Sequence, residues 1–287
     1  MKIWMDGSVR EPHQCAVPVL DHGLLYGDGV FEGIRITQGR VFRLAHHVER
    51  LSRSACAIGL HLPLSESEIT DVVLETARAH GHREAYVRLI VTRGVGELNL
   101  DPLNCFEPRL VCIVAPIKMF DAESSRNGLK LMTAARRRPP LDVLDPQVKS
   151  LNYLNNVLSK RQARLAGYDD ALVLNQQGRV AEASAANVFC VSDNVLLTPP
   201  PVEGALPGIT RAAMLQAFQD IGAQVAEQPF GVYDLLNASE AFLSGSGVGL
   251  VGVASLDNAQ IGDGKRPWLK QAQALYTRIA ERDGVPC

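Results

Sequence analysis

The sequence predicts an α/β fold in two lobes, because strand and helix patterns are mixed in both halves of the chain. Its 287 residues, 46% of them apolar, are enough for one large core or two medium ones. Periodicity is lost in a polar stretch between Pro116 and Gly128. We therefore expect a small domain at residues 1–116, a linker at residues 117–128 and a large domain at residues 129–287.

The N-terminal half is predicted to begin with a hairpin that turns at Asp6-Gly7. A second helix of this half is expected over Ser65–His80, since Ser65 and Glu68 form a capping box. The first helix is predicted from apolar residues at helical spacing, and it carries Arg50. These apolar residues are Leu44, Val48, Leu51, Ala55 and Ile58.

Two segments rich in Val, Ile and Leu, Ala85–Thr92 and Arg109–Ala115, predict buried strands. Tyr86 and Arg88 alternate along the first of them, so both side chains are expected on the same face. They form either a binding pair or an ordinary polar outer face.

The C-terminal half alternates predicted strands and helices around a proline-rich loop at Arg138–Gln147. The run Arg136-Arg137-Arg138 is interpreted as a solvated basic face. The predicted elements are a strand at Leu129–Ala135, a helix at about Ser150–Ala166, a hairpin of Ala171–Leu174 and Arg179–Ala181, a helix at about Ile209–Ile221 and a strand at Ala241–Leu243.

Two segments have the character of anion sites. Leu206–Arg211 leads into a helix, whose start offers unpaired backbone N–H groups to a phosphate. Ser244–Gly249 is glycine-rich and follows a strand, so its amides can approach an anion closely. Taken alone, the first is more typical of an ordinary capped helix, because most helix starts bind nothing, and the second is more typical of a flexible turn.

Two charged residues stand beside predicted elements. Lys149 precedes the helix expected from Ser150, and a positive helix end would lower the pKa of its amine. Glu182 follows the apolar pair Val180-Ala181 at the end of the hairpin. A solvated lysine and an edge carboxylate in water are the alternative interpretations.

Composition excludes several function classes. A net charge of -2 and a pI near 6.4 do not fit a nucleic-acid-binding protein. The six cysteines lie far apart without metal-ligand spacing, so we expect no metal site and a reducing, cytoplasmic location. No apolar stretch approaches the ~18 residues of a membrane helix, and we expect no signal peptide.

Five segments that contain these residues resemble the class IV aminotransferases, which include the branched-chain-amino-acid aminotransferases. In chain order they are Asp21–Arg35, Val148–Asn156, Val180–Phe189, Thr198–Pro200 and Leu206–Arg211. The resemblance implies the two-domain fold type IV architecture of pyridoxal 5′-phosphate enzymes, the D-amino-acid aminotransferase-like fold.

The resemblance also implies a role for each cofactor contact. Lys149 would hold pyridoxal 5′-phosphate as a Schiff base and move a proton between substrate and cofactor. Glu182 would keep the pyridine nitrogen protonated, which makes the ring an electron sink. Tyr153 would hydrogen-bond the phenolic oxygen of the ring. The residues implied for the phosphate are Arg50, Ile209, Thr210 and Ser246.

For the substrate, the resemblance implies that Tyr86 and the region of Gly247 meet the α-carboxylate. Arg88, together with Tyr26 of the partner subunit, would receive the side-chain carboxylate of glutamate. The residues implied for the apolar part of the pocket are Phe31, Ile117 and Phe120. The enzyme would be a homodimer or larger homo-oligomer with active sites at the dimer interface.

The function implied is transamination between a branched-chain L-amino acid and 2-oxoglutarate. The segment Gly94–Asn99 lacks the Arg and His of D-amino-acid aminotransferases, which favours the L series. A D-amino-acid or broad-range aminotransferase and a 4-amino-4-deoxychorismate lyase are the alternatives. The loop Gly245–Gly249 departs from the Gly-Thr-Ala-Ala-Glu of the family, so the substrate range stays open.

Overall fold

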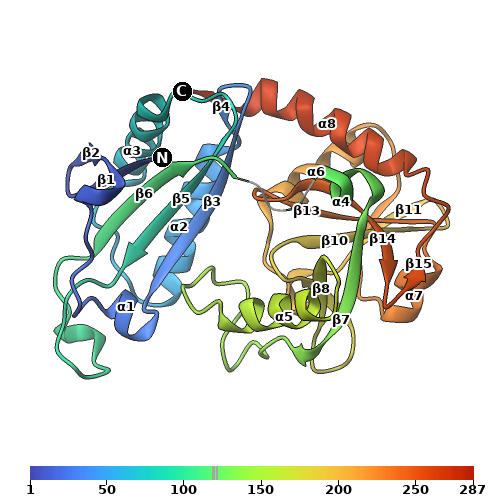
Figure 1. The fold of residues 1–287 in the computed structure, drawn as a ribbon, viewed down its shortest axis with the longest axis horizontal. Coiled ribbons are helices and arrows are strands. Elements are labelled where there is room, and N and C mark those ends of the chain that lie inside the picture. Colours follow the sequence, from blue (N-terminus) through green and yellow to red (C-terminus); the bar gives the residue numbers. More distant parts are fainter. Residues whose placement is uncertain (118–119, 121) are drawn as a thin grey trace. The chain divides into compact units, whose positions relative to one another are not determined.

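The protein, described by a computed structural model over residues 1–117, 120 and 122–287, divides into two compact units (Figure 1). The first contains Met1–Ile117, Val148–Asn152 and Ala280–Cys287, and the second contains Lys118–Gln147 and Tyr153–Ile279. The expected linker includes residues 118, 119 and 121, which lie outside the described residues. The segment around Lys149 belongs to the first unit.

The first unit is built on a seven-stranded antiparallel sheet in the order β16-β4-β3-β5-β6-β1-β2. Its strands are β1 (Lys2–Met5), β2 (Ser8–Arg10), β3 (Gly29–Thr37), β4 (Arg40–Val41), β5 (Ala85–Thr92), β6 (Arg109–Ala115) and β16 (Val285–Pro286). Its helical segments are η1 (Pro12–Gln14), α1 (His22–Tyr26), α2 (Leu44–Ala57), α3 (Glu66–His80) and η2 (Pro102–Asn104).

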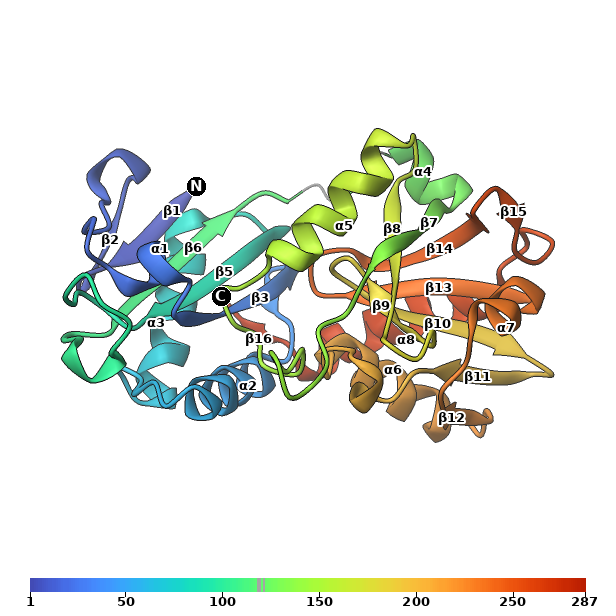
Figure 2. The ribbon, with the colours of Figure 1, turned by 90° about the horizontal axis from the view of Figure 1, so that it is seen from below.

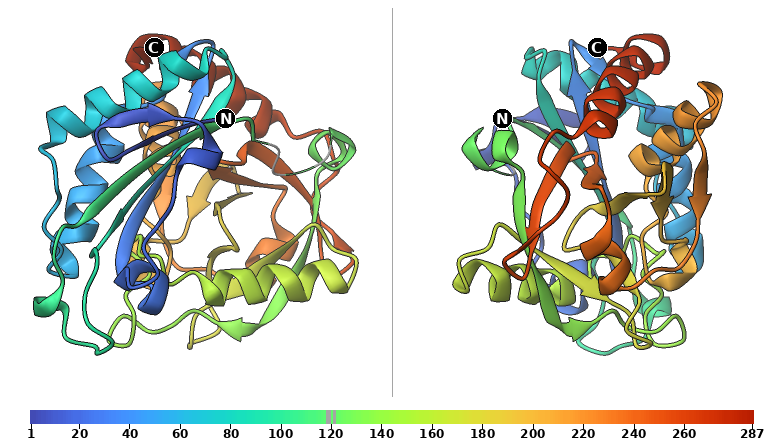
Figure 3. Two further views of the ribbon diagram at one scale, coloured as in Figure 1. Left: turned by 60° about the vertical axis from the view of Figure 1, so that its left-hand side comes forward. Right: turned by 90° about the vertical axis from the view of Figure 1, so that its right-hand side faces the viewer.

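Helices α2 and α3 cover one face of this sheet and form the core of the first unit with it (Figure 3). Val30, Ile34 and Ile36 of β3 point into that core. Because side chains alternate along a strand, Phe31 and Gly33 belong to the opposite face. The two faces of β3 therefore present different chemistry.

The second unit contains a nine-stranded mixed sheet in the order β12-β11-β10-β13-β14-β7-β8-β9, with β15 beside β14. Neighbours β11/β12, β14/β7 and β7/β8 are parallel. The strands are β7 (Leu129–Arg137), β8 (Asp170–Leu174), β9 (Val180–Ala183), β10 (Asn187–Ser192), β11 (Val195–Thr198), β12 (Val225–Glu227), β13 (Glu240–Gly245), β14 (Gly249–Leu256) and β15 (Ala259–Gln260).

Helices of the second unit pack around this sheet, and α5 contacts β7 and β8 (Figure 2). The helical segments are α4 (Ala122–Asn127), α5 (Leu154–Leu165), η3 (Pro201–Glu203), α6 (Ile209–Asp220), α7 (Val232–Asn237) and α8 (Pro267–Asp283). Within the described residues, no helix is long and apolar enough to cross a membrane.

The mixed α/β class predicted from the sequence is confirmed. The predicted strands at Ala85–Thr92 and Arg109–Ala115 have the predicted bounds, and Ser65 caps α3 through the expected box with Glu68. Strand β14 and helix α8 were not predicted. The helix expected from Ser150 begins only at Leu154, so Lys149 does not directly precede a helix.

Candidate active site

The face of β3 and β5 opposite the helices carries an aromatic and cationic cluster. The guanidinium carbon of Arg88 lies 4.5 Å from the centre of the Phe31 ring and 5.6 Å from that of Tyr86. Arg88 also donates from Nη2 to the Tyr86 hydroxyl at 3.4 Å. The prediction that Tyr86 and Arg88 share a face is therefore confirmed.

Gly33 makes room for this cluster. It is the register partner of Arg88 in the β3/β5 pair. A Cβ atom on Gly33 would lie 1.8 Å from the Tyr86 hydroxyl, well inside contact distance. Any larger residue would push the Tyr86 ring off this part of the sheet, so the glycine keeps the ring where Arg88 can reach it.

Lys149 joins the same cluster through an extended segment that runs along β3. Phe31 N donates to the Lys149 carbonyl at 2.9 Å, and Leu151 N donates to the Gly29 carbonyl at 2.9 Å. Lys149 N donates to Ser54 Oγ of α2 at 3.2 Å. These backbone contacts place Lys149 Nζ 4.4 Å from the centre of the Phe31 ring.

The prediction that Lys149 directly precedes a helix is wrong. The residues after it pair with β3, as in the bridge between Ser150 and Val30, and Tyr153 is the N-cap of α5. The pairing with β3 keeps the segment extended in place of the helical start that local sequence suggests. The Phe31 ring, and not a helix end, lies beside the amine.

A cluster of buried polar and charged side chains lies on the other face of β3, between Glu32 of β3 and residues of α2. Glu32 accepts from Arg50 Nε at 2.7 Å and from Arg50 Nη2 at 2.8 Å, so the guanidinium binds the carboxylate with two parallel bonds. His47 Nδ1 lies 2.7 Å from Glu32 Oε2. The side chains of Glu32 and His47 are fully buried, and that of Arg50 is 11% exposed.

Burial and neighbouring charge act differently on these groups. Burial opposes the charge of Glu32, but Arg50 and His47 outweigh it and hold the pKa of Glu32 below its usual range. Burial lowers the pKa of His47, against the attraction of Glu32 and with help from Arg50 and Lys149. His47 is therefore neutral and donates from Nδ1 to the ionised Glu32, so their contact is a hydrogen bond rather than an ion pair.

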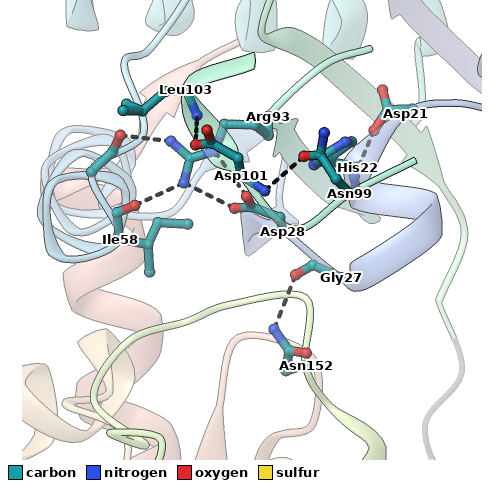
Figure 4. A network of polar contacts seen from close by, with 12 residues as sticks. Asp21, His22, Gly27, Asp28, Ile58, Arg93, Asn99, Asp101, Leu103 and Asn152 are labelled. Carbon is teal, nitrogen blue, oxygen red and sulfur yellow. Dashed lines mark hydrogen bonds and ion pairs between the residues drawn. The ribbon is translucent and has the colours of Figure 1, made fainter. Parts of the chain in front are cut away.

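A polar network orders the turn that carries Tyr26 at the end of α1 (Figure 4). Arg93 binds Asp28 through Nε at 2.9 Å and Nη2 at 3.0 Å, and it donates to the carbonyls of Ile58 and Gly59. Asn152 Nδ2 donates to the Gly27 carbonyl at 3.0 Å. The turn after Tyr26 is thus tied to the segment that carries Lys149.

In the second unit, Glu182 of β9 is buried, so the interpretation as an edge carboxylate in water is wrong. Arg138 Nη2 donates to its Oε1. Asn187 Nδ2 and Leu206 N donate to its Oε2 at 2.9 Å and 3.2 Å. A buried carboxylate with a cation and two N–H donors is favoured in its ionised form.

The interpretation of Arg136-Arg137-Arg138 as a solvated basic face is wrong for Arg138. Arg136 and Arg137 are exposed, as expected, whereas Arg138 is buried and its side chain passes beside Gly204. Gly204 has φ +97, and a Cβ there would lie 3.2 Å from the Cβ of Arg138. A left-handed glycine therefore leaves the space through which Arg138 reaches Glu182.

The start of α6 has the features of an anion site. Gly208 is its N-cap and supplies no side-chain cap, so the first backbone N–H groups of Ile209 and Thr210 are open to a ligand. Among the described residues, the buried Thr210 Oγ1 has no hydrogen-bond partner. A phosphate would satisfy both, because it carries several acceptor oxygens.

The remaining residues predicted for the site lie on other elements of the second unit, except Ile117. Ser246 and Gly247 are half-buried in the turn between β13 and β14, and Tyr153 is half-buried at the start of α5. Phe120 packs against the core of the second unit, with Lys160 Nζ 4.6 Å from its ring centre. Ile117 is the last residue of the first segment of the first unit.

The residues predicted for the site fall into two groups, one in each unit, and within the first group Arg50 lies on the opposite face of β3 from Lys149, Phe31, Tyr86 and Arg88. The first unit holds Lys149, Arg50, Phe31, Tyr86, Arg88 and Tyr26, and the second holds Tyr153, Glu182, Ile209, Thr210, Ser246 and Gly247. Among the described residues, no group of three His, Cys, Asp or Glu side chains could hold a metal ion.

Four buried residues of these groups were missed from sequence: Glu32, His47, Arg138 and Asn187. A signal existed for Glu32, which interrupts the apolar alternation of β3 on its core-facing side. The partners of Arg138 and Asn187 are set by tertiary contacts that no local pattern reveals.

Comparison with known proteins agrees with this geometry. The profile of the family described as amino-transferase class IV matches residues 29–256. A Methanocaldococcus jannaschii protein, provisionally named a branched-chain-amino-acid aminotransferase, is 45% identical over 92% of each chain. The D-alanine aminotransferase of Bacillus licheniformis is 34% identical over 92% of this chain and 91% of its own.

Solved structures give the same result. The branched-chain aminotransferase of Thermoproteus uzoniensis with norvaline superposes with a TM-score of 0.92 at 32% identity, covering 99% of this chain and 95% of that one. The branched-chain amino acid aminotransferase of Escherichia coli has a TM-score of 0.91 at 30% identity, covering 95% and 92%. This chain is an enzyme that belongs to the class IV aminotransferases.

Proposed function

We propose that the enzyme uses pyridoxal 5′-phosphate to exchange amino groups between a branched-chain L-amino acid and 2-oxoglutarate. The observation that carries the proposal is the shared position of Lys149 and Arg88 around the Phe31 ring, with Lys149 Nζ at 4.4 Å and the Arg88 guanidinium at 4.5 Å. An amine, an apolar ring and a carboxylate receptor in one place suit both an apolar amino acid and a dicarboxylate.

The residues present fit pyridoxal 5′-phosphate. The uncapped start of α6 and the unpartnered Thr210 Oγ1 suit its phosphate, together with Arg50, Ile209 and Ser246. The carboxylate of Glu182 suits a protonated pyridine nitrogen, and Tyr153 would hydrogen-bond the phenolic oxygen. When bound, the cofactor supplies a carbonyl that receives the amino group and a ring that withdraws electrons.

Each of the residues around the cofactor and the substrate would then have its own role. Lys149 Nζ holds the cofactor and moves a proton at the substrate Cα. Tyr86, with the backbone of the Gly247 region, binds the α-carboxylate. Arg88 binds the second carboxylate of glutamate, because a guanidinium can grip a carboxylate in a bidentate way. Phe31 gives an apolar side chain a hydrophobic surface to pack against.

An exchange of D-amino acids is the second candidate, because the Bacillus licheniformis relative is named a D-alanine aminotransferase. The lyase alternative has no support among the relatives described above. A panel of L- and D-amino donors with 2-oxoglutarate tests the proposal. We expect the highest kcat/KM with L-leucine, L-isoleucine or L-valine, and faster turnover of D-alanine than of these three would contradict it.

We also propose that the enzyme is a homodimer at least, with Tyr26 reaching the site of its partner subunit. The first unit exposes large apolar side chains near this turn, including Val19 at 74% and Phe106 at 71% exposed. Leu20 O accepts from Gly96 N and Val95 O accepts from Phe106 N, so these segments are adjacent. Such a patch is typical of a protein interface.

Light scattering at micromolar concentration measures this state, and a fully active monomer would contradict the assembly. The cytoplasmic location stays a prediction from the sequence.

A further inference from the structure

Three donors of the second unit surround the buried carboxylate of Glu182. Arg138 approaches one carboxylate oxygen, and Asn187 Nδ2 and Leu206 N approach the other. Glu182 is therefore fixed on both sides by donors of the second unit. Arg138 alone among these three brings a charge.

Arg138 is buried beside Glu182, and its burial costs free energy because one of its donors is not hydrogen-bonded within the part of the chain that the structure describes. Its side chain is 4% exposed, and among the described residues its buried Nε has no hydrogen-bond partner. Most buried polar atoms in proteins are hydrogen-bonded, so an unpaired buried Nε costs free energy. The contact between Arg138 Nη2 and Glu182 Oε1 offsets this cost, which indicates that the charge of Arg138 serves the carboxylate.

Asn187 connects this carboxylate to the helix start that suits a phosphate. Its Nδ2 donates to Glu182 Oε2 and to the Leu206 carbonyl, both at 2.9 Å. A Cβ on Gly208 would lie 1.9 Å from Asn187 Oδ1, so only glycine fits at the N-cap of α6. Asn187 thus fixes the position of Glu182 relative to the start of α6.

We propose that Arg138 is a positioning residue that, with Asn187, holds Glu182 as an ionised carboxylate aimed at the ring nitrogen of the cofactor. This inference rests on the proposed function. Without the positive charge of Arg138, burial favours the neutral carboxylic acid. A neutral Glu182 would keep the proton that the ring nitrogen needs.

The test measures the ring nitrogen directly, by ¹⁵N NMR of enzyme reconstituted with ¹⁵N-labelled pyridoxal 5′-phosphate at pH 7. We expect a protonated-ring signal in the wild type and a neutral-ring signal in Glu182→Gln. Arg138→Gln should move the signal toward that of Glu182→Gln, with about a tenfold fall in the ratio of protonated to neutral ring. Arg136→Gln removes an exposed charge nearby and should leave the signal unchanged.

Arg138→Lys keeps the charge and should retain the protonated signal. If Arg138→Gln fails to fold, this variant decides, because a neutral-ring signal in Arg138→Lys overturns the proposal. A fully protonated ring in a folded Arg138→Gln also overturns it. A wild type that binds no cofactor, or a Glu182→Gln variant with a protonated ring, would instead contradict the proposed function.

Discussion

Because Glu32 and Arg50 form a buried ion pair, Glu32→Gln should lower the unfolding midpoint far more than the same change at the exposed Glu49. Glu32→Gln keeps the shape of the side chain but removes its charge, which leaves Arg50 buried beside a neutral amide. The pair has two hydrogen bonds of 2.7 and 2.8 Å, and the side chains are 0% and 11% exposed. Glu32→Gln therefore removes the carboxylate that compensates the Arg50 charge in these two hydrogen bonds.

Removing one partner of a buried ion pair costs about 3–5 kcal/mol. At about 2–4 °C per kcal/mol, the unfolding midpoint should fall by about 6–20 °C. The matched control is Glu49→Gln on the same helix, whose partner Arg53 is exposed. An exposed pair is worth about 0–1 kcal/mol, so this variant should unfold close to the wild type.

Differential scanning calorimetry of the cofactor-free protein measures both variants. Affinity for pyridoxal 5′-phosphate should fall in Glu32→Gln but not in Glu49→Gln, since the carboxylate of Glu32 no longer holds the Arg50 guanidinium in place. If the two variants unfolded at the same temperature, Glu32 would not compensate Arg50 and the account of this pair would be refuted.

Three further predictions follow from the first unit. Because burial lowers the pKa of His47, the unfolded chain takes up a proton below about pH 6.5 that the folded chain does not. The free energy of unfolding should therefore decrease from pH 7 to pH 5 in urea titrations, and a His47→Gln variant with the same slope would contradict this. Arg88→Leu should reduce kcat/KM about ten- to a hundredfold in the glutamate half-reaction and much less in the leucine half-reaction, and equal losses in single-turnover kinetics would assign the carboxylate elsewhere. Gly33→Ala should displace the Tyr86 hydroxyl and raise KM while the unfolding midpoint changes little, and an unchanged KM would show that this hydroxyl does not bind substrate.

The parts of the fold that sequence predicts best are those with strong local patterns. The bounds of β5 were predicted because alternation and apolar content agree there, and Ser65 marks the start of α3 through a local hydrogen-bond motif. Arg50 was placed on its helix by the spacing of apolar residues. In each case the signal lies within a few residues of the element that it predicts.

The positions of Lys149 and Arg138 could not be predicted from local sequence. Local sequence favours a helix after Lys149, but Ser150 and Leu151 bond to β3, which lies far away in the chain. Arg138 has two arginines before it, and only its contact with Glu182 and the space beside Gly204 make it a buried residue. Long-range contacts decide both positions.

The identity of the cofactor lysine is the central claim, and reduction with borohydride tests it most directly. Enzyme reconstituted with pyridoxal 5′-phosphate should be reduced, digested and mapped by mass spectrometry. We expect a pyridoxyl-phosphate label on the peptide that contains Lys149 and no stable label in Lys149→Ala. A label on a different lysine of the wild type would contradict it.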